Sequence, residues 1–74
     1  MKHNEELDFN IIRDNFPYEI LLLADETKDA INKYLLDSIV YEVTKSGETV
    51  GVFCLFEIDK NTIELKNIAV VEII

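Results

Sequence analysis

The end of the chain constrains the fold more than any other stretch, and it reads TIELKNIAVVEII. Its first half alternates like a half-buried strand, with Ile63 and Leu65 on one face and charged residues on the other. The strongest apolar pair of the second half, Ile68 and Val70, has the opposite parity. Because a slip of one residue swaps the two faces of a strand, this pattern predicts a β-bulge near Asn67.

The predicted strand begins at Thr62, pairs regularly to about Lys66 and ends at about Val71. A strand buried on both faces is the alternative interpretation, since it also reads as a continuous apolar run. The two interpretations differ in their consequences, because bulges bend a strand and are frequent beside active sites.

Length, composition and charge exclude several classes of protein. The chain has 74 residues, enough for one small domain, and 49% of them are hydrophobic, which excludes a disordered tail. The net charge of −8 disfavours nucleic acid and anionic membrane surfaces as partners, since both attract Lys and Arg. No stretch approaches the ~20 apolar residues of a membrane span, and the polar start MKHNEELD is no signal peptide. We therefore expect a cytoplasmic protein.

The first half of the chain is predicted to form a strand and two short helices. Pro17 suits the first turn of one helix, and the acidic and hydroxyl residues at positions 25–27 suit the cap and first turn of another. The predicted ranges are Leu7–Arg13 for the strand, Tyr18–Ala24 for the first helix, and from the cap to about Leu36 for the second.

Alternating apolar residues and two turn signals predict an antiparallel meander in the second half. The turns are Ser46-Gly47-Glu48 and Asp59-Lys60-Asn61, and the strands are Ile39–Lys45, Val50–Ile58 and the C-terminal strand. The expected fold class is α+β, with an N-terminal strand and two short helices before a three-stranded meander.

The middle strand of this meander requires cover on both faces. Val52, Cys54 and Phe56 share one face, and Phe53 and Leu55 share the other. Two short helices cover only one face of a sheet. Burial of a large apolar side chain is worth about 1.5–3 kcal/mol, so we expect the other face to be covered by a second copy of the chain or by further chain. The isolated chain is accordingly predicted to be a homo-oligomer.

Few residues of this chain offer chemistry. The single histidine, His3, lies in the polar terminus, and neither a metal site nor a Gly-rich phosphate loop is predicted. Cys54 lies within an apolar run and is expected to be a buried thiol. Glu64 is the candidate catalytic residue, because a carboxylate inside a strand beside a bulge can act as a general base. The alternative is a solvated glutamate beside Lys66.

Three segments resemble, in this order, the N-terminal half of the GNAT N-acetyltransferase superfamily. They are PYEILLLADET, VYEVTKSGETVGVFCL and TIELKNIAVVE, and the resemblance covers about Asn10 to Glu72. It implies half of an acyl-CoA N-acyltransferase fold. It also implies acetyl-CoA as co-substrate, with direct transfer of acetyl to a primary amine and neither a metal nor a covalent enzyme intermediate.

The resemblance assigns roles to residues of the C-terminal strand. In the family this strand bulges, and backbone groups beside the bulge bind the pantetheine arm of the cofactor. Matched by position, these groups belong to Ile68, Ala69 and Val70. Glu64 matches a glutamate that in some members accepts a proton from the amine, directly or through water.

The sequence departs from the family pattern at its end. Family members continue into a Q/R-x-x-G-x-G/A loop and a helix whose N-terminus holds the pyrophosphate. Residues 1–74 are therefore expected to be a single partial domain, truncated before this loop, that binds acetyl-CoA weakly or not at all. The alternative function is a small non-enzymatic interaction module that dimerises through its uncovered face.

Overall fold

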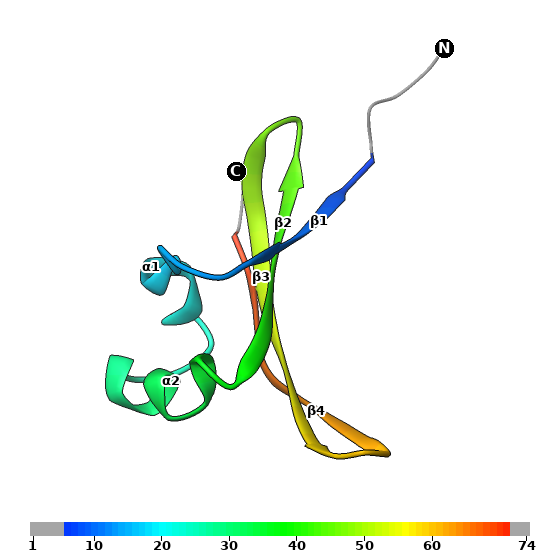
Figure 1. The fold of residues 1–74 in the computed structure, drawn as a ribbon. Helices are drawn as coiled ribbons and strands as arrows, with labels where there is room; N and C mark the ends of the chain where they lie inside the picture. Colours follow the sequence, from blue (N-terminus) through cyan, green and yellow to red (C-terminus); the bar gives the residue numbers. More distant parts are fainter. Residues whose placement is uncertain (1–5, 72–74) are drawn as a thin grey trace.

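The structure, a computed structural model, describes residues 6–71. Its elements are β1 (Asp8–Ile12), α1 (Tyr18–Leu21), α2 (Lys28–Leu35), β2 (Ser38–Lys45), β3 (Glu48–Asp59) and β4 (Thr62–Val70) (Figure 1). The expectation for His3 lies outside the described residues.

The four strands form one antiparallel sheet in the order β1-β2-β3-β4. This confirms the predicted α+β class and the meander of the last three strands. The sequence left β1 unplaced, and the structure pairs it with β2 in a register that sets Ile12 opposite Val40. Both helices lie on the same side of the sheet (Figure 1).

Helix α1 is shorter than the sequence predicts, whereas α2 has the predicted bounds within one residue. After Leu21, the N–H groups of Leu23 and Ala24 bond three residues back, to the carbonyls of Ile20 and Leu21, at 2.9 and 3.2 Å. This tighter turning ends α1 before Ala24. Thr27 caps α2 as predicted, and its hydroxyl oxygen accepts a hydrogen bond from the Ala30 N–H at 3.0 Å.

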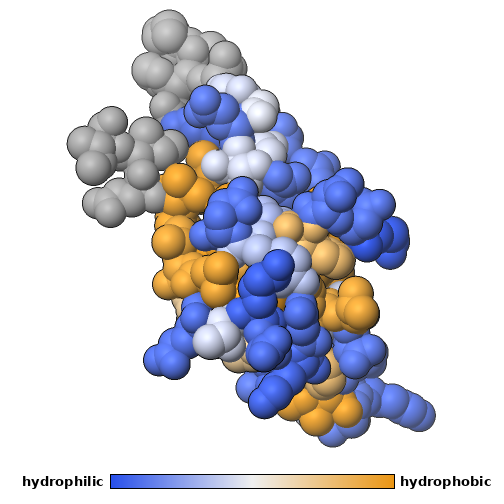
Figure 2. Space-filling view, turned by 90° about the vertical axis from the view of Figure 1, so that its left-hand side faces the viewer, coloured by the Kyte–Doolittle hydropathy of each residue, from blue (hydrophilic) through white to orange (hydrophobic). Residues whose placement is uncertain are grey.

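The core lies between the helices and one face of the sheet. Its fully buried members come from α1, α2 and the middle strands: Leu21, Ile31, Leu35, Val40, Val52 and Cys54. Seen from the helix side, hydrophilic residues cover much of the surface above this core (Figure 2). The helices therefore bury apolar side chains against the sheet and present polar side chains to solvent, as their amphipathic sequences predict.

The opposite face of the sheet, which we call the open face, has no cover within residues 6–71. Tyr41 and Phe53 stack there with ring centroids 4.9 Å apart, and Phe9 meets Phe53 edge-on at 6.2 Å. The large exposed apolar side chains of this face are 45% to 69% exposed: Leu7, Phe9, Ile11, Ile39, Ile63, Leu65, Ile68 and Val70. The expectation that the helices cover only one face is confirmed for the described residues.

Candidate functional site at the edge of strand β4

The register of β3 and β4 shifts where the sequence predicts a bulge. Cys54 lies opposite Asn67, but the next residue, Leu55, lies opposite Leu65. Lys66 is therefore the extra residue on β4. The prediction of a bulge near Asn67 is confirmed.

The bulge explains why the apolar parity changes along β4. Leu65 faces Leu55, and Ile68 faces Phe53, so both halves of the strand direct their large apolar side chains to the open face. Ile68 is 58% exposed and Val70 is 69% exposed. The alternative of a strand buried on both faces is therefore wrong for residues 62–70.

Past the bulge, alternate residues of β4 direct their backbone groups to opposite sides. The Val71 N–H donates to the Val50 carbonyl at 2.9 Å, so the backbone of Val71 faces β3. In an antiparallel ladder this orientation alternates. The N–H and C=O groups of Val70 and Ile68 accordingly face the free edge of the sheet, whereas those of Ala69 face β3.

A shallow apolar groove of about 270 Å³ lies on the open face and reaches this edge. Its lining comes from the residue before β1 and from all four strands: Leu7, Phe9, Val43, Val50, Gly51, Val52, Phe53, Ile68, Ala69 and Val70. Gly51 permits a close approach of β3 and β4, because a Cβ at this position would lie 3.1 Å from the Ala69 carbonyl oxygen. The edge of β4 thus combines directed backbone groups with apolar walls.

Asn67 is a buried polar residue at the bulge, and its side chain is 4% exposed. Its amide nitrogen donates to the carbonyl oxygen of Leu21 at 3.2 Å and to the hydroxyl oxygen of Tyr34 at 3.0 Å. The Tyr34 hydroxyl in turn donates to Asp25 at 2.9 Å. Burial raises the pKa of Tyr34, Asp25 raises it further, and the hydrogen bond from Asn67 opposes both.

Glu64 lies on the helix side of the sheet, opposite Phe56. Its carboxylate is about half exposed and lies 3.2 Å from the Lys66 ammonium, which also stands 5.5 Å above the Phe56 ring. Glu64 therefore shares β4 with Ile68 and Val70, although its side chain leaves the opposite face. Its catalytic role stays a prediction.

Cys54 is fully buried under the helices, as predicted, and burial raises the pKa of its thiol to about 11. A thiol in this state is a poor nucleophile. Within residues 6–71, no group of three or more His, Cys, Asp or Glu side chains could hold a metal ion. No helix of this range is long and apolar enough to span a membrane.

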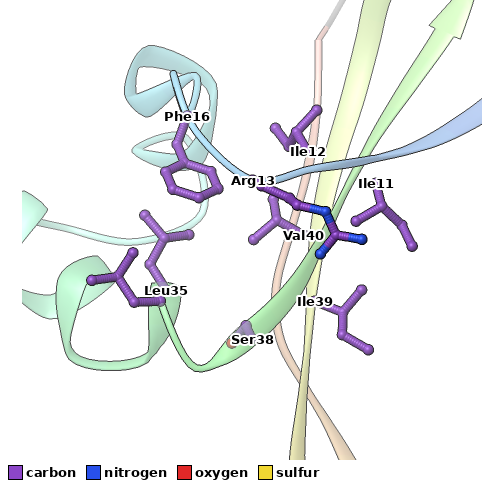
Figure 3. A pocket seen from close by; sticks show the side chains of 9 residues that line it. Ile11, Ile12, Arg13, Phe16, Leu35, Ser38, Ile39 and Val40 are labelled. Carbon is purple, nitrogen blue, oxygen red and sulfur yellow. The ribbon is translucent and has the colours of Figure 1, made fainter.

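A second cavity, of about 290 Å³, lies at the other end of the strand order, between the β1–β2 edge and α2. Phe16 and Leu35 approach each other on its helix side, and the Arg13 guanidinium extends near Ile39 at its mouth (Figure 3). This cavity and the groove that reaches the β4 edge share no lining residue, so the two are distinct.

Solved structures of acetyltransferases match this fold. A GNAT family acetyltransferase from Elizabethkingia anophelis with acetyl-CoA bound matches 92% of the chain at a TM-score of 0.85 and 34% identity. A Bacillus subtilis acetyltransferase in complex with CoA matches 90% of it at a TM-score of 0.82 and 33% identity. The chain covers 46% and 45% of these two proteins, respectively.

A curated sequence relative points to the same class of protein. The uncharacterized N-acetyltransferase YvbK of Bacillus subtilis strain 168 is 40% identical over 55 residues, which are 74% of this chain and 36% of YvbK. No family profile matches the sequence. The fold and the relatives together show that the chain belongs to the GNAT superfamily and has the N-terminal half of its fold. It spans about half the length, or less, of the proteins it matches.

Sequence reasoning located the bulge but missed what holds it. Asn67 entered the sequence analysis only as the position of the kink, and its bonds to Leu21 and Tyr34 cross 46 and 33 residues. The available signal was a polar residue between two apolar runs, at the point where parity changes. That signal alone does not identify the partners.

Proposed function

We propose that the chain provides the pantetheine-binding edge of an N-acetyltransferase that transfers acetyl from acetyl-CoA to an amine. The observation that carries this proposal is the β4 bulge, which leaves the backbone groups of Ile68 and Val70 at a free edge beside an apolar groove. An amide-rich arm can satisfy such groups as an added strand would. The solved relatives with acetyl-CoA or CoA bound support the same ligand.

Each candidate residue has a defined part in this proposal. Ile68 and Val70 offer outward N–H and C=O groups to the arm, and one of the N–H groups polarises the thioester carbonyl, as in an oxyanion hole. The family resemblance predicts that the Ala69 backbone binds the cofactor as well. Because the ladder directs its N–H and C=O groups to β3, Ala69 instead keeps the two strands paired in this proposal. Bound acetyl-CoA would supply the acetyl group as a thioester.

Glu64 is the proposed acceptor of the amine proton as the nitrogen attacks the thioester carbonyl and the carbon–sulfur bond breaks. Its half-exposed carboxylate is accessible to an amine or to a bridging water. The acceptor amine approaches from the helix side of β4, where this carboxylate lies.

Ligand-observed NMR with three compounds tests the proposal. Acetyl-CoA and acetyl-pantetheine are expected to bind residues 1–74 with similar, millimolar affinity, because the β4 edge recognises the arm that they share. The nucleotide portion, 3′-phospho-ADP, is expected not to bind. Binding of the nucleotide without binding of acetyl-pantetheine would contradict the proposal.

We also propose that a second copy covers the open face when the 74-residue chain is isolated. The large apolar side chains of this face are 45% to 69% exposed, and one partner of a standard interface buries about 800 Å². A two-fold pair of sheets stacked face to face would bury this surface on both copies. Light scattering coupled to size exclusion at micromolar concentration is expected to give twice the 8.6 kDa chain mass, and a stable folded monomer would contradict this.

A further inference from the structure

The orientation of the Asn67 side chain is fixed by what surrounds it. Its amide group contacts the Leu21 carbonyl, which can only accept a hydrogen bond, so the nitrogen must point there. Turning the amide over would place oxygen against oxygen. The same nitrogen bonds the Tyr34 hydroxyl, which uses its own hydrogen for Asp25. Both protons of the amide nitrogen are therefore used.

The amide oxygen of Asn67 is buried and finds no hydrogen-bond partner within residues 6–71. An unpartnered buried acceptor destabilises a fold. Leucine has the same branched arrangement of side-chain heavy atoms and carries no acceptor, so it would avoid this cost. Packing alone therefore does not explain why asparagine occupies this position. The hydrogen bonds that its side chain donates to the two helices explain it.

Those bonds hold β4 beside the bulge, where its register with β3 shifts. Without the extra residue, regular pairing would continue from Leu65 and set Ile68 opposite Val52 instead of Phe53. Ile68 and Val70 would then turn their backbone groups to β3, and Ala69 would face the free edge. The bulge thus determines which backbone amides of β4 face the free edge of the sheet.

We propose that Asn67 is a positioning residue for the acetyl-CoA site: its two hydrogen bonds to the helical layer lock the β4 bulge, so that Ile68 and Val70 present their backbone groups at the free edge. The part of this inference that concerns acetyl-CoA binding rests on the proposed function. The locking itself is a property of the chain without any ligand. The two can therefore fail separately.

Amide hydrogen exchange with residue resolution tests the locking. In the native chain, Ala69 and Val71 are expected to exchange at least about 100-fold more slowly than Ile68 and Val70, since only the first pair is bonded to β3. In Asn67→Leu the contrast is expected to fall below about tenfold or to reverse, while the amides of β2 opposite β3 stay protected. An unchanged contrast in a folded Asn67→Leu would overturn the proposal.

Asn10→Leu is the matched control, because Asn10 is an exposed asparagine on β1, far from the bulge in the strand order. It is expected to keep the native exchange pattern. Titration of acetyl-pantetheine is expected to shift the Ile68 and Val70 amides in this control and not in Asn67→Leu. If no shift occurs even in the native chain while the exchange contrast holds, the ligand assignment fails and the locking stands.

A measurement on the native chain decides the question if Asn67→Leu does not fold. The side-chain amide protons of Asn67 are expected to exchange at rates within about threefold of those of the Ala69 and Val71 backbone amides. The reason is that a single local opening of β4 would expose all of these protons to solvent. Side-chain protons that exchange as fast as those of a solvated asparagine, while Ala69 and Val71 stay protected, would overturn the proposal.

Discussion

Two adjacent leucines at the end of α2 allow the packing of the helical layer to be tested with one chemical change. Leu35 is 1% exposed and belongs to the core, whereas Leu36 is 82% exposed. Replacing a buried leucine by alanine removes its burial and leaves a cavity, at a cost of 2–5 kcal/mol. The same change at an exposed position stays within about 0.5 kcal/mol.

The expected difference is large for a chain of this size. A domain of 74 residues has a total stability of about 4–11 kcal/mol at 0.05–0.15 kcal/mol per residue. Leu35→Ala should therefore remove about a fifth of the free energy of unfolding or more. With an m-value of about 1 kcal/mol/M, the urea midpoint should fall by about 2 M or more, and Leu36→Ala should shift it by less than about 0.5 M.

Urea unfolding followed by circular dichroism is the assay, with all variants at one protein concentration because association would shift the midpoint. Leu35→Met, which conserves volume, should cost less than 1.5 kcal/mol. Equal losses for Leu35→Ala and Leu36→Ala would refute the placement of α2 on the sheet.

Further predictions concern association, pH and capping. Ile39→Lys, on the open face, should shift the oligomer toward monomer by light scattering, whereas Leu36→Lys, outside this face, should not; the reverse result would exclude the open face as the interface. Burial raises the pKa of Cys54 from about 9 in the unfolded chain to about 11 in the folded chain. Between these two values the folded chain keeps the thiol proton that the unfolded chain has lost. The free energy of unfolding should therefore fall as the pH rises from about 9 to 11, by at most about 1.4 kcal/mol per pH unit. Cys54→Ala should flatten this decline, and an identical slope in both proteins would contradict the assignment. Thr27→Ala removes the cap on the Ala30 N–H and should cost about 1 kcal/mol in thermal unfolding; an unchanged midpoint would show that this cap contributes nothing.

Much of the fold could be predicted from local patterns in the sequence. The alternation of apolar residues and the Ser46-Gly47 turn, in which both residues have positive φ (54° and 84°), were sufficient to place the hairpin of β2 and β3. The parity change in β4 was sufficient to place the bulge. These features depend on residues close together in sequence, which a single sequence displays directly.

Long-range features escaped the sequence analysis for a physical reason. The pairing of β1 with β2 joins segments separated by both helices, and nothing in β1 specifies its neighbour. The hydrogen bonds from Asn67 to Leu21 and Tyr34 likewise depend on where α1 and α2 come to rest. The same contrast between local and long-range features holds for the candidate site. Strand β4 and its bulge were predicted, whereas the hydrogen bonds of Asn67 that hold the strand against the helices were not.

The most direct test of the account is an amide-resolved NMR titration of the chain with acetyl-pantetheine. If the β4 edge binds the pantetheine arm, the Ile68 and Val70 amides should shift most, followed by residues that line the adjoining groove, and the Ala69 amide should change little. Shifts centred on the cavity near Phe16 and Leu35, or no shift at millimolar ligand, would contradict the central claim.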